Sequence, residues 1–209
     1  MNLIKASYEI LGEVNAGQMC KNIELYGRVC YKSESGIAPD SSESFIRKII
    51  QNGHESVIEH EKITVKFICD RGVTHEIVRH RIASYSQEST RYCNYAKERF
   101  GRELTFIKPC FWDENDEGYK IWAENMQQTE CSYLQMIDLG IPPEQARSIL
   151  PNSLKTELIV TMNLRAWRHF FRLRASNRAH PQMREISRPL LEEMKRMLPA
   201  VFEDIFANP

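Results

Sequence analysis

The chain has 209 residues, of which 42% are hydrophobic and 27% charged, a composition typical of a globular protein with a sizeable core. Lysine plus arginine and aspartate plus glutamate number 28 each, so the formal net charge is zero, which argues against a protein dedicated to nucleic acids or membrane surfaces. The sequence has no apolar run of roughly 20 residues and starts without a hydrophobic signal segment, so we expect a cytoplasmic protein with no membrane span.

The first fifty residues predict a strand and two helices. Residues 3–11 are expected to form a short strand and residues 18–30 a helix, followed by a loop over 36–42 that is rich in turn residues. Apolar residues then recur at helical spacing, so we predict a helix that Ser42 caps and that runs to about residue 51. Asn52-Gly53 is expected to end it, as glycine often does after a helix.

The middle of the chain alternates between strand and loop. Residues 63–70 carry apolar side chains at every second position and predict a strand. Thr74 is a plausible N-cap for a short helix through Arg81. Residues 82–96 show neither period, so we expect an ordered loop there, and residues 103–108 are expected to form another strand.

The last hundred residues are mainly helical. We predict helices over 115–139 and from Pro143 to about 150, a strand over 154–163, and further helices over 164–175, 181–198 and a short piece to 206. Strands and helices interleave without glycine-rich turns, so we predict an α+β fold, with a mixed or antiparallel sheet flanked by helices. GxGxxG and P-loop motifs are absent, so a bound nucleotide would need another binding device.

The run Arg79-His80-Arg81 is the first candidate for chemistry. Adjacent cationic side chains repel one another, and an anion such as phosphate stabilises them because arginine offers it bidentate hydrogen bonds. A nearly unbroken run of hydroxyl, amide and charged residues follows from Ser84 to Arg91, and such donors suit phosphate recognition. The alternative is a solvated basic loop.

Histidines and acids also cluster between His54 and His60. Two histidines and two acids within seven residues suggest a metal site, but the spacing is not that of a helical zinc motif, so we expect hydrogen bonding to a polar ligand and no metal. The six cysteines are scattered without a CxxC pair and are expected to be free thiols.

The predicted helix after Asn163 has a basic face and an aromatic face. The basic face carries Arg165, Arg168, His169 and Arg172. The other face carries Trp167, Phe170 and Phe171, and Arg174 falls among them. Burying a guanidinium there costs free energy unless it is paired or contacts a ligand, although it can also extend to water from the helix end. Seven arginines between 165 and 188 predict a surface that faces an anion.

Together these segments resemble the flavin-dependent thymidylate synthases (the ThyX family). Its signature, RHR followed by seven residues and a serine, matches Arg79-His80-Arg81 and Ser89. The similarity extends to Arg91-Tyr92, to the segment from Gly53 to His60, to Arg147 before Leu150-Pro151, and to the segment from Asn163 through Arg165 and His169 to Arg174.

The resemblance implies one domain over residues 1–209, FAD as cofactor, and a homotetramer whose sites are shared between subunits. The implied flavin contacts are Ser56, Arg79, His80, Arg81, Gln87, Asn163, Arg165 and His169. The implied dUMP contacts are Glu76, Arg79, Gln87, Ser89, Arg91, Arg147 and Arg174. His54 is a further candidate for a folate or flavin contact. Position 87 is often Glu and position 76 often Gln in the family, and this chain has the two exchanged.

The resemblance also implies a methyltransferase of nucleotide biosynthesis that converts dUMP to dTMP. Methylenetetrahydrofolate would donate the carbon and NADPH, through FAD, the hydride. No cysteine would attack the ring; Arg174 would instead stabilise the ionised uracil and is the expected catalytic residue. An RNA-binding helix over 165–174 is one rival hypothesis. A flavin or nucleotide enzyme of another reaction, such as a nucleotide hydrolase, is the second.

Overall fold

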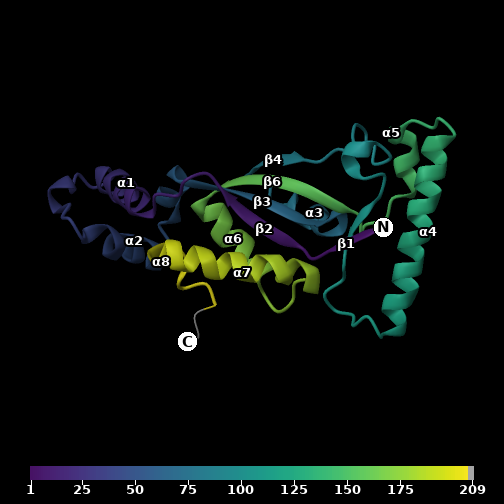
Figure 1. The fold of residues 1–209 in the computed structure, drawn as a ribbon. Coiled ribbons are helices and arrows are strands. Elements are labelled where there is room, and N and C mark those ends of the chain that lie inside the picture. The colour runs from purple at the N-terminus through teal and green to yellow at the C-terminus, as the bar shows by residue number, and fades with distance from the viewer. Residues whose placement is uncertain (207–209) are drawn as a thin grey trace. The chain divides into compact units, whose positions relative to one another are not determined.

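The computed structural model describes residues 1–206, apart from the side chain of Arg99. Its helices and strands are β1 (Asn2–Ile4), β2 (Ser7–Leu11), α1 (Ala16–Val29), α2 (Ser41–Gln51), β3 (Lys62–Asp70), α3 (Arg71–Ile77), β4 (Ser84–Gln87), β5 (Thr105–Ile107), α4 (Glu117–Asp138), α5 (Pro143–Ala146), β6 (Lys155–Asn163), α6 (Leu164–Arg174), α7 (Pro181–Met197) and α8 (Pro199–Phe202). Short 3₁₀ helices lie between them: η1 (Glu34–Gly36), η2 (Glu55–His60), η3 (Glu98–Phe100) and η4 (Arg147–Ile149). This mixture of elements confirms the predicted α+β class (Figure 1).

The strands form two sheets. One has the order β2-β3-β6-β4, and the other pairs β1 with β5 in parallel. Strands β3 and β6 run antiparallel, because Thr64 contacts Thr161 at 2.9 Å while Lys66, two residues further along β3, contacts Glu157, four residues earlier in β6, at 2.6 Å. The structure therefore contains both parallel and antiparallel pairing, in agreement with the predicted mixed or antiparallel sheet.

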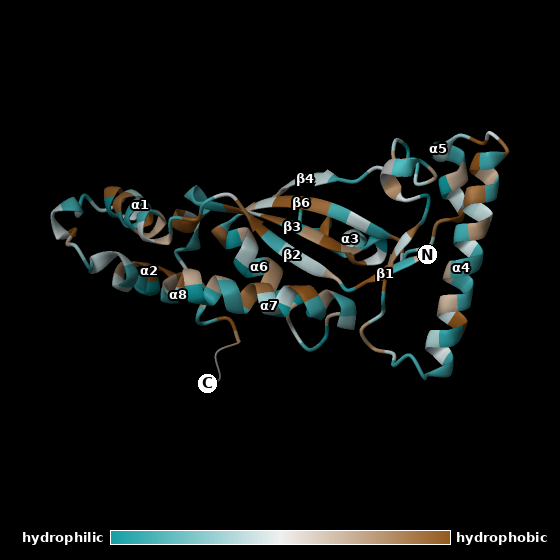
Figure 2. Ribbon diagram, viewed as in Figure 1, coloured by the Kyte–Doolittle hydropathy of each residue, from teal (hydrophilic) through white to brown (hydrophobic). Residues whose placement is uncertain are grey.

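The alternation in the sequence correctly predicted which face of β3 and β6 is buried. Ile63, Val65, Phe67 and Cys69 of β3 are at most 2% exposed, and Leu158, Val160 and Met162 of β6 at most 1%. Figure 2 shows hydrophobic residues along these strands, whereas hydrophobic and hydrophilic residues alternate along α4.

Four local predictions are corrected by the structure. Helix α2 begins at Ser41 with Asp40 at the N-cap position, so Ser42 lies inside the helix and does not cap it. Residues 3–11 form two strands, β1 and β2, and not one. The short helix before the RHR run begins at Arg71 because Asp70, not Thr74, is its N-cap, accepting a hydrogen bond from the Val73 N–H at 2.8 Å. It ends at Ile77, before Arg81, and the expected loop over 82–96 contains β4.

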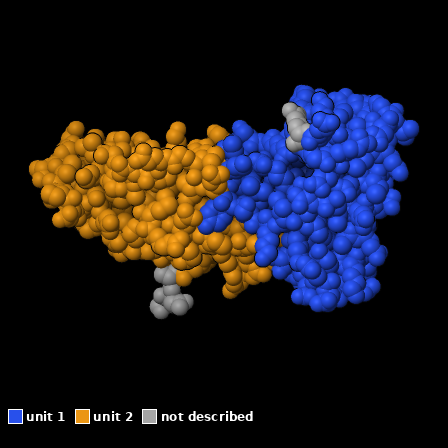
Figure 3. All heavy atoms as spheres, in the orientation of Figure 1, with its two compact units in different colours: residues 1–8, 66–79, 85–159 blue, residues 9–65, 80–84, 160–209 orange. Residues whose placement is uncertain are grey.

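The chain divides into two compact units (Figure 3). Unit 1 comprises residues 1–8, 66–79 and 85–159, and unit 2 comprises residues 9–65, 80–84 and 160–209. The expected single domain over 1–209 stays a prediction. Among the described residues no helix is both long and apolar enough to span a membrane.

Each unit has its own core. In unit 1, α4 contributes Met126 and Tyr133 to a cluster with Tyr95, Leu104 and Phe106. In unit 2, the aromatic face of α6 is buried as predicted: Trp167, Phe170 and Phe171 are each 0% exposed and in mutual ring contact. The Trp167 Nε1–H donates to the Ile63 carbonyl at 3.0 Å and so anchors α6 to β3.

The end of α2 sets the start of the segment that carries His54. Gly53 has φ of +74°, a left-handed conformation that favours glycine, and its N–H donates to the Ile50 carbonyl at 2.9 Å. The His54 N–H donates to the Ile49 carbonyl at 2.8 Å. This pair of bonds closes the helix as predicted and places His54 at the N-cap of η2.

Candidate active site

In unit 2, Arg174 and His80 are joined by a hydrogen bond. The Arg174 Nε–H donates to Nε2 of His80 at 3.1 Å. His80 is 8% exposed and makes edge-to-face contacts with the rings of Phe170, 5.1 Å away, and His169, 5.6 Å away. The structure therefore brings together three of the predicted site residues, and Arg174, half-buried, lies beside the aromatic face of α6 as expected.

His80 must be neutral for this contact to form, because its Nε2 has to accept a hydrogen bond. Burial lowers its pKa to about 4, helped by the positive charge of Arg174 and by His169. At neutral pH the imidazole therefore carries its proton on Nδ1 and presents a lone pair to the guanidinium of Arg174. His80 thus orients the guanidinium of Arg174 and, because it is neutral, does not cancel the positive charge.

Three further predicted residues, His54, Ser56 and Arg165, line one pocket of unit 2. The pocket has a volume of about 900 Å³ and also takes in Arg28, Tyr31, Phe45, Lys48 and Asn52. Helices α1 and α2, which run side by side in Figure 1, form part of the pocket lining. Their close approach requires glycine at position 27, because a Cβ there would lie only 2.6 Å from the Phe45 ring.

The side chains that line this pocket include cations, two of which pair with glutamates outside the lining: Arg28 with Glu24 and Arg165 with Glu59, each at 2.6 Å. Among the described lining residues three are permanently cationic, Arg28, Lys48 and Arg165, and none is acidic. Aromatic side chains lie next to them, and Arg28 stacks over the Phe45 ring at 5.0 Å. A site with cations, hydroxyls and aromatic rings suits a ligand that combines a phosphate with a planar ring system.

Acids from other segments pair with the three arginines on the basic face of α6. Arg168 is 0% exposed, and its guanidinium contacts Glu55 and Asp204. Arg165 pairs with Glu59 at 2.6 Å, and Arg172 pairs with Glu55 at 3.2 Å. The helical period placed these side chains on one face correctly, but it could not reveal that acids from other segments neutralise them.

In unit 1, Gln87 is fixed by two buried threonines. Its Nε2 donates to the hydroxyl oxygen of Thr74 at 3.0 Å and to that of Thr156 at 3.4 Å. The Thr74 hydroxyl donates its own proton to the Arg71 carbonyl, so its partner at position 87 must be a donor. An ionised Glu cannot donate, which gives a structural reason for the amide here.

Ser89, Arg91 and Arg147 occupy neighbouring turns of unit 1. The Arg91 N–H donates to the Ser89 hydroxyl at 3.3 Å, and the Arg91 guanidinium lies 3.8 Å from the carboxylate of Glu144. Glu144 belongs to α5, which leads directly into Arg147, so this contact brings the two arginines to one end of the unit. Both side chains are exposed and accessible to an anion.

The remaining predicted residues are placed separately. Arg79 and Arg81 are exposed, and the RHR run is divided, with Arg79 in unit 1 and the other two in unit 2. Glu76 is half-buried on α3. Asn163 caps α6 through its side-chain oxygen, which accepts from the Ala166 N–H at 2.8 Å and leaves its amide NH₂ for a ligand.

Sequence reasoning missed Arg28 and Lys48 as pocket residues, and also Glu55 as the partner of the basic face. The helical spacing could have indicated Lys48, because it follows Phe45 by three residues, about one turn, and so shares its face of α2. For Arg28 and Glu55 no spacing in the sequence indicates the role.

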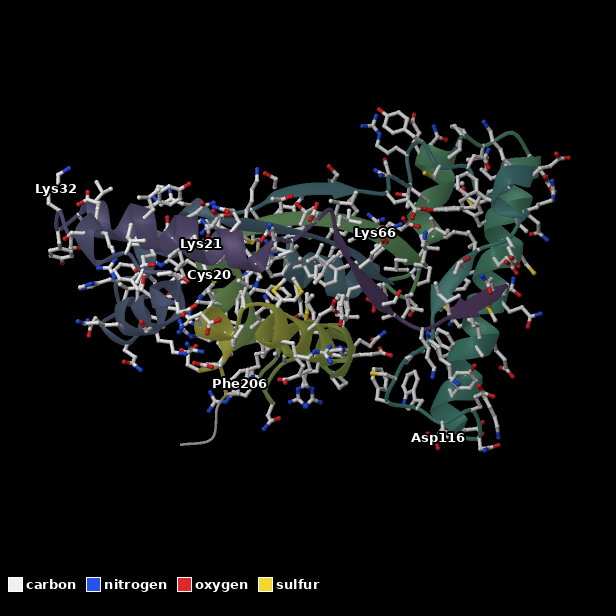
Figure 4. All side chains as sticks on the ribbon, turned by 60° about the vertical axis from the view of Figure 1, so that its left-hand side comes forward. Cys20, Lys21, Lys32, Lys66, Asp116 and Phe206 are labelled. Carbon is white, nitrogen blue, oxygen red and sulfur yellow. The ribbon has the colours of Figure 1, made fainter. Side chains whose placement is uncertain are left out.

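All six cysteines are free thiols, and two of them line smaller pockets. Cys93 is half-buried in unit 1 beside a pocket of about 460 Å³ that also includes Gln87 and Lys66 (Lys66 is labelled in Figure 4). Cys20, on α1 next to Lys21, lines a pocket of about 500 Å³ in unit 2 (Figure 4). Burial raises the pKa of Cys20 to about 11, which keeps this thiol protonated and a poor nucleophile.

The comparisons with known proteins cover most of the chain. The family model described as thymidylate synthase complementing protein matches residues 15–200. A flavin-dependent thymidylate synthase from Pyrococcus furiosus is 40% identical, and the match covers 83% of this chain and 71% of the relative. A flavin-dependent thymidylate synthase from Geobacter sulfurreducens is 34% identical, and the match covers 87% of this chain and 80% of the relative. The crystal structure of a UMP/dUMP methylase, PolB from Streptomyces cacaoi with bound 5-Br dUMP, is similar in fold, with a TM-score of 0.76 and 24% sequence identity. The alignment covers 97% of this chain and 96% of the PolB chain. The chain therefore belongs to the thymidylate synthase complementing protein family, the family of the flavin-dependent thymidylate synthases.

Proposed function

We propose that the chain methylates dUMP. The balanced reaction is dUMP plus methylenetetrahydrofolate plus NADPH and a proton, giving dTMP, tetrahydrofolate and NADP⁺. The observation that carries the proposal is the half-buried Arg174, held by a neutral histidine within a chain that belongs to this family. Methyl transfer to carbon 5 of uracil requires the ring to be activated, and this arginine is suited to that step.

Arg174 would activate the ring electrostatically. Carbon 5 of uracil is a weak nucleophile, and its electron density rises when the N3–C4 region carries negative charge. A guanidinium that is partly removed from water and fixed in orientation stabilises such a charge far better than an exposed one. No covalent bond from a cysteine to the ring is needed in this scheme.

The unit 1 residues would hold the nucleotide. Arg91 and Arg147 would bind its phosphate, with the Ser89 hydroxyl as a further donor, because arginine forms bidentate bonds to phosphate oxygens. Gln87, whose amide nitrogen is engaged by the two threonines, would offer its oxygen as an acceptor. Glu76 and Arg79 are the other proposed contacts with dUMP.

The residues of the unit 2 pocket fit a flavin. Lys48 supplies positive charge toward a pyrophosphate, and Ser56 supplies a hydroxyl. Arg165 and Arg28 also line the pocket and can donate to phosphate oxygens, although each is paired with a glutamate, Glu59 and Glu24 respectively, at 2.6 Å. The proposed set of flavin contacts also includes Arg79, His80, Arg81, Gln87, Asn163 and His169, with His54 as a folate or flavin contact. A bound flavin supplies hydride chemistry, with NADPH as the proposed source of electrons.

We further propose a homotetramer that works in the cytoplasm. Shared sites would explain why the proposed ligand contacts are spread over many segments of the chain. Six free thiols favour a reducing compartment.

The visible absorption spectrum of the purified protein tests cofactor and substrate together. We expect a flavin band at about 450 nm that changes on addition of dUMP, and NADPH oxidation that dUMP stimulates. Colourless protein that cannot be reconstituted with FAD would contradict the flavin assignment. Flavin-bound protein that is insensitive to dUMP would point to another flavin reaction.

A further inference from the structure

Arg168 is fully buried at the centre of an ion-pair network in unit 2. Its Nη1 and Nη2 bond to the two carboxylate oxygens of Asp204 at 2.6 and 2.7 Å, a bidentate pair. Its Nε and Nη2 both donate to one oxygen of Glu55, at 3.2 and 3.1 Å, and Nη1 also donates to the Val201 carbonyl. One guanidinium therefore links α6, η2 and the turn that follows α8.

Glu55 lies between two residues of the proposed flavin pocket. His54 and Ser56, its immediate neighbours, line that pocket, whereas Glu55 itself is turned toward Arg168. Its other partners are Arg172 at 3.2 Å and Arg165, a pocket residue, at 3.9 Å. The carboxylate of Glu55 thus fixes the backbone from which both pocket side chains extend.

The energetics favour a tight arrangement. Removing either carboxylate leaves the fully buried guanidinium of Arg168 with part of its charge uncompensated, which is unfavourable. Burial alone would raise the pKa of Asp204, but the hydrogen bonds from Arg168 outweigh it and hold that pKa below its ordinary value. Arg168 is therefore charged and paired at neutral pH.

We propose that Glu55, Arg168 and Asp204 are positioning residues that hold the His54–Ser56 wall of the pocket, and that Asp204, through Arg168, affects flavin affinity although it does not line the pocket. This inference rests on the proposed function for the identity of the ligand. It gives a binding role to a residue, Asp204, that lies outside the site.

The test compares three variants that each replace one carboxylate by the matching amide. Glu55→Gln should weaken FAD binding roughly tenfold and Asp204→Asn severalfold. The dissociation constant is measured by flavin fluorescence titration of the purified full-length protein. Glu203→Gln is the matched control: this neighbour of Asp204 is also ion-paired, with Arg47 at 2.6 Å, but on an exposed surface. We expect its FAD affinity to equal that of the wild type.

A second readout does not need flavin. The imidazole NMR signals of His54 in flavin-free protein should shift in Glu55→Gln and Asp204→Asn and stay in place in Glu203→Gln. Lower melting temperatures with unchanged FAD affinity and unchanged His54 signals would overturn the proposal, since they would show a purely stabilising role. If the wild type binds no FAD, the proposed function fails, and the NMR comparison still decides whether the network positions His54.

Discussion

At the scale of single residues, the contact between Arg174 and His80 explains how an arginine can stay beside an aromatic cluster. The sequence put Arg174 on the apolar side of its helix and left two explanations, a ligand contact or an extension to water. The structure adds an acceptor 94 positions away in the chain, the Nε2 of His80. A neutral acceptor orients the guanidinium without neutralising it.

Replacing Arg174 by Ala tests its proposed role. We expect Arg174→Ala to keep flavin and to lose dTMP formation by at least about 100-fold, because one preorganised electrostatic contact contributes roughly 3–4 kcal/mol to a transition state. The measurements are the flavin spectrum and product formation under single-turnover conditions. Arg196→Ala, at an exposed position of α7, is the control and should be as active as the wild type. Near-normal turnover of Arg174→Ala would show that the role is wrong.

The lowered pKa of His80 predicts a dependence of stability on pH. Between the ordinary value of 6.5 and the folded value of about 4, the unfolded chain binds a proton that the folded chain excludes, so this contribution to stability falls as the pH falls. His80→Gln keeps an acceptor but cannot titrate. The difference in unfolding free energy between the wild type and this variant should therefore shrink from pH 7 to pH 4.5, as measured by urea denaturation.

The exposed His75 provides the control for that experiment. The variant His75→Gln should leave the pH dependence close to that of the wild type. Parallel stability curves for the wild type and His80→Gln would contradict the assignment of a buried, neutral His80.

Cys93 tests the absence of a cysteine nucleophile. This thiol is half-buried next to the motif, and its N–H donates to the Ser89 carbonyl at 2.9 Å, a backbone bond that alanine preserves. We expect Cys93→Ala to retain dTMP formation within about twofold, a change of less than roughly 0.5 kcal/mol. A variant with bound flavin but no activity would contradict ring activation by Arg174 alone.

At the scale of elements, the turn between α2 and η2 couples local backbone geometry to the site. Gly53→Ala should destabilise the protein by about 1–2 kcal/mol, because a Cβ is strained at φ of +74°, and should weaken FAD binding by displacing His54. Gly17→Ala in the first turn of α1 is the matched control. A Cβ there would lie 3.8 Å from the Asn15 Oδ1, an ordinary van der Waals contact, and alanine is favoured in a helix. Thermal unfolding and flavin titration separate the two effects, and equal behaviour of both variants would refute the argument.

The elements that the sequence predicted best are those with a strong period. The alternation in β3 and the two-faced pattern of α6 follow directly from burial on one side, so both could be predicted. The start of α3 could not be predicted in this way, because Asp70 and Thr74 are both good N-cap residues. The helix begins directly after the last residue of β3, Asp70, which therefore takes the N-cap position. Strand β4 was missed because its side chains are at best half-buried and give no apolar period.

At the scale of the whole molecule, the proposed homotetramer predicts a particle of about four times the 24.5 kDa of one chain. Light scattering after size exclusion measures this mass, and we expect it to persist in Arg174→Ala, whose change removes a side chain from the site and leaves the core of α6 intact. A monomer with full activity would exclude sites shared between subunits.

The sequence by itself determined the family, the identity of the residues that can bind phosphate or activate a ring, and the buried faces of the main strands and helices. These properties depend on residue type and on short-range spacing. Only the tertiary structure decided which of the arginines are paired with acids and which are accessible to a ligand. Arg165, Arg168 and Arg172 resemble a ligand-binding face in the sequence. In the structure each pairs with a carboxylate from another segment: Arg165 with Glu59, Arg168 with Glu55 and Asp204, and Arg172 with Glu55. Ion pairing depends on distance in space, and the linear order of the chain does not contain that distance.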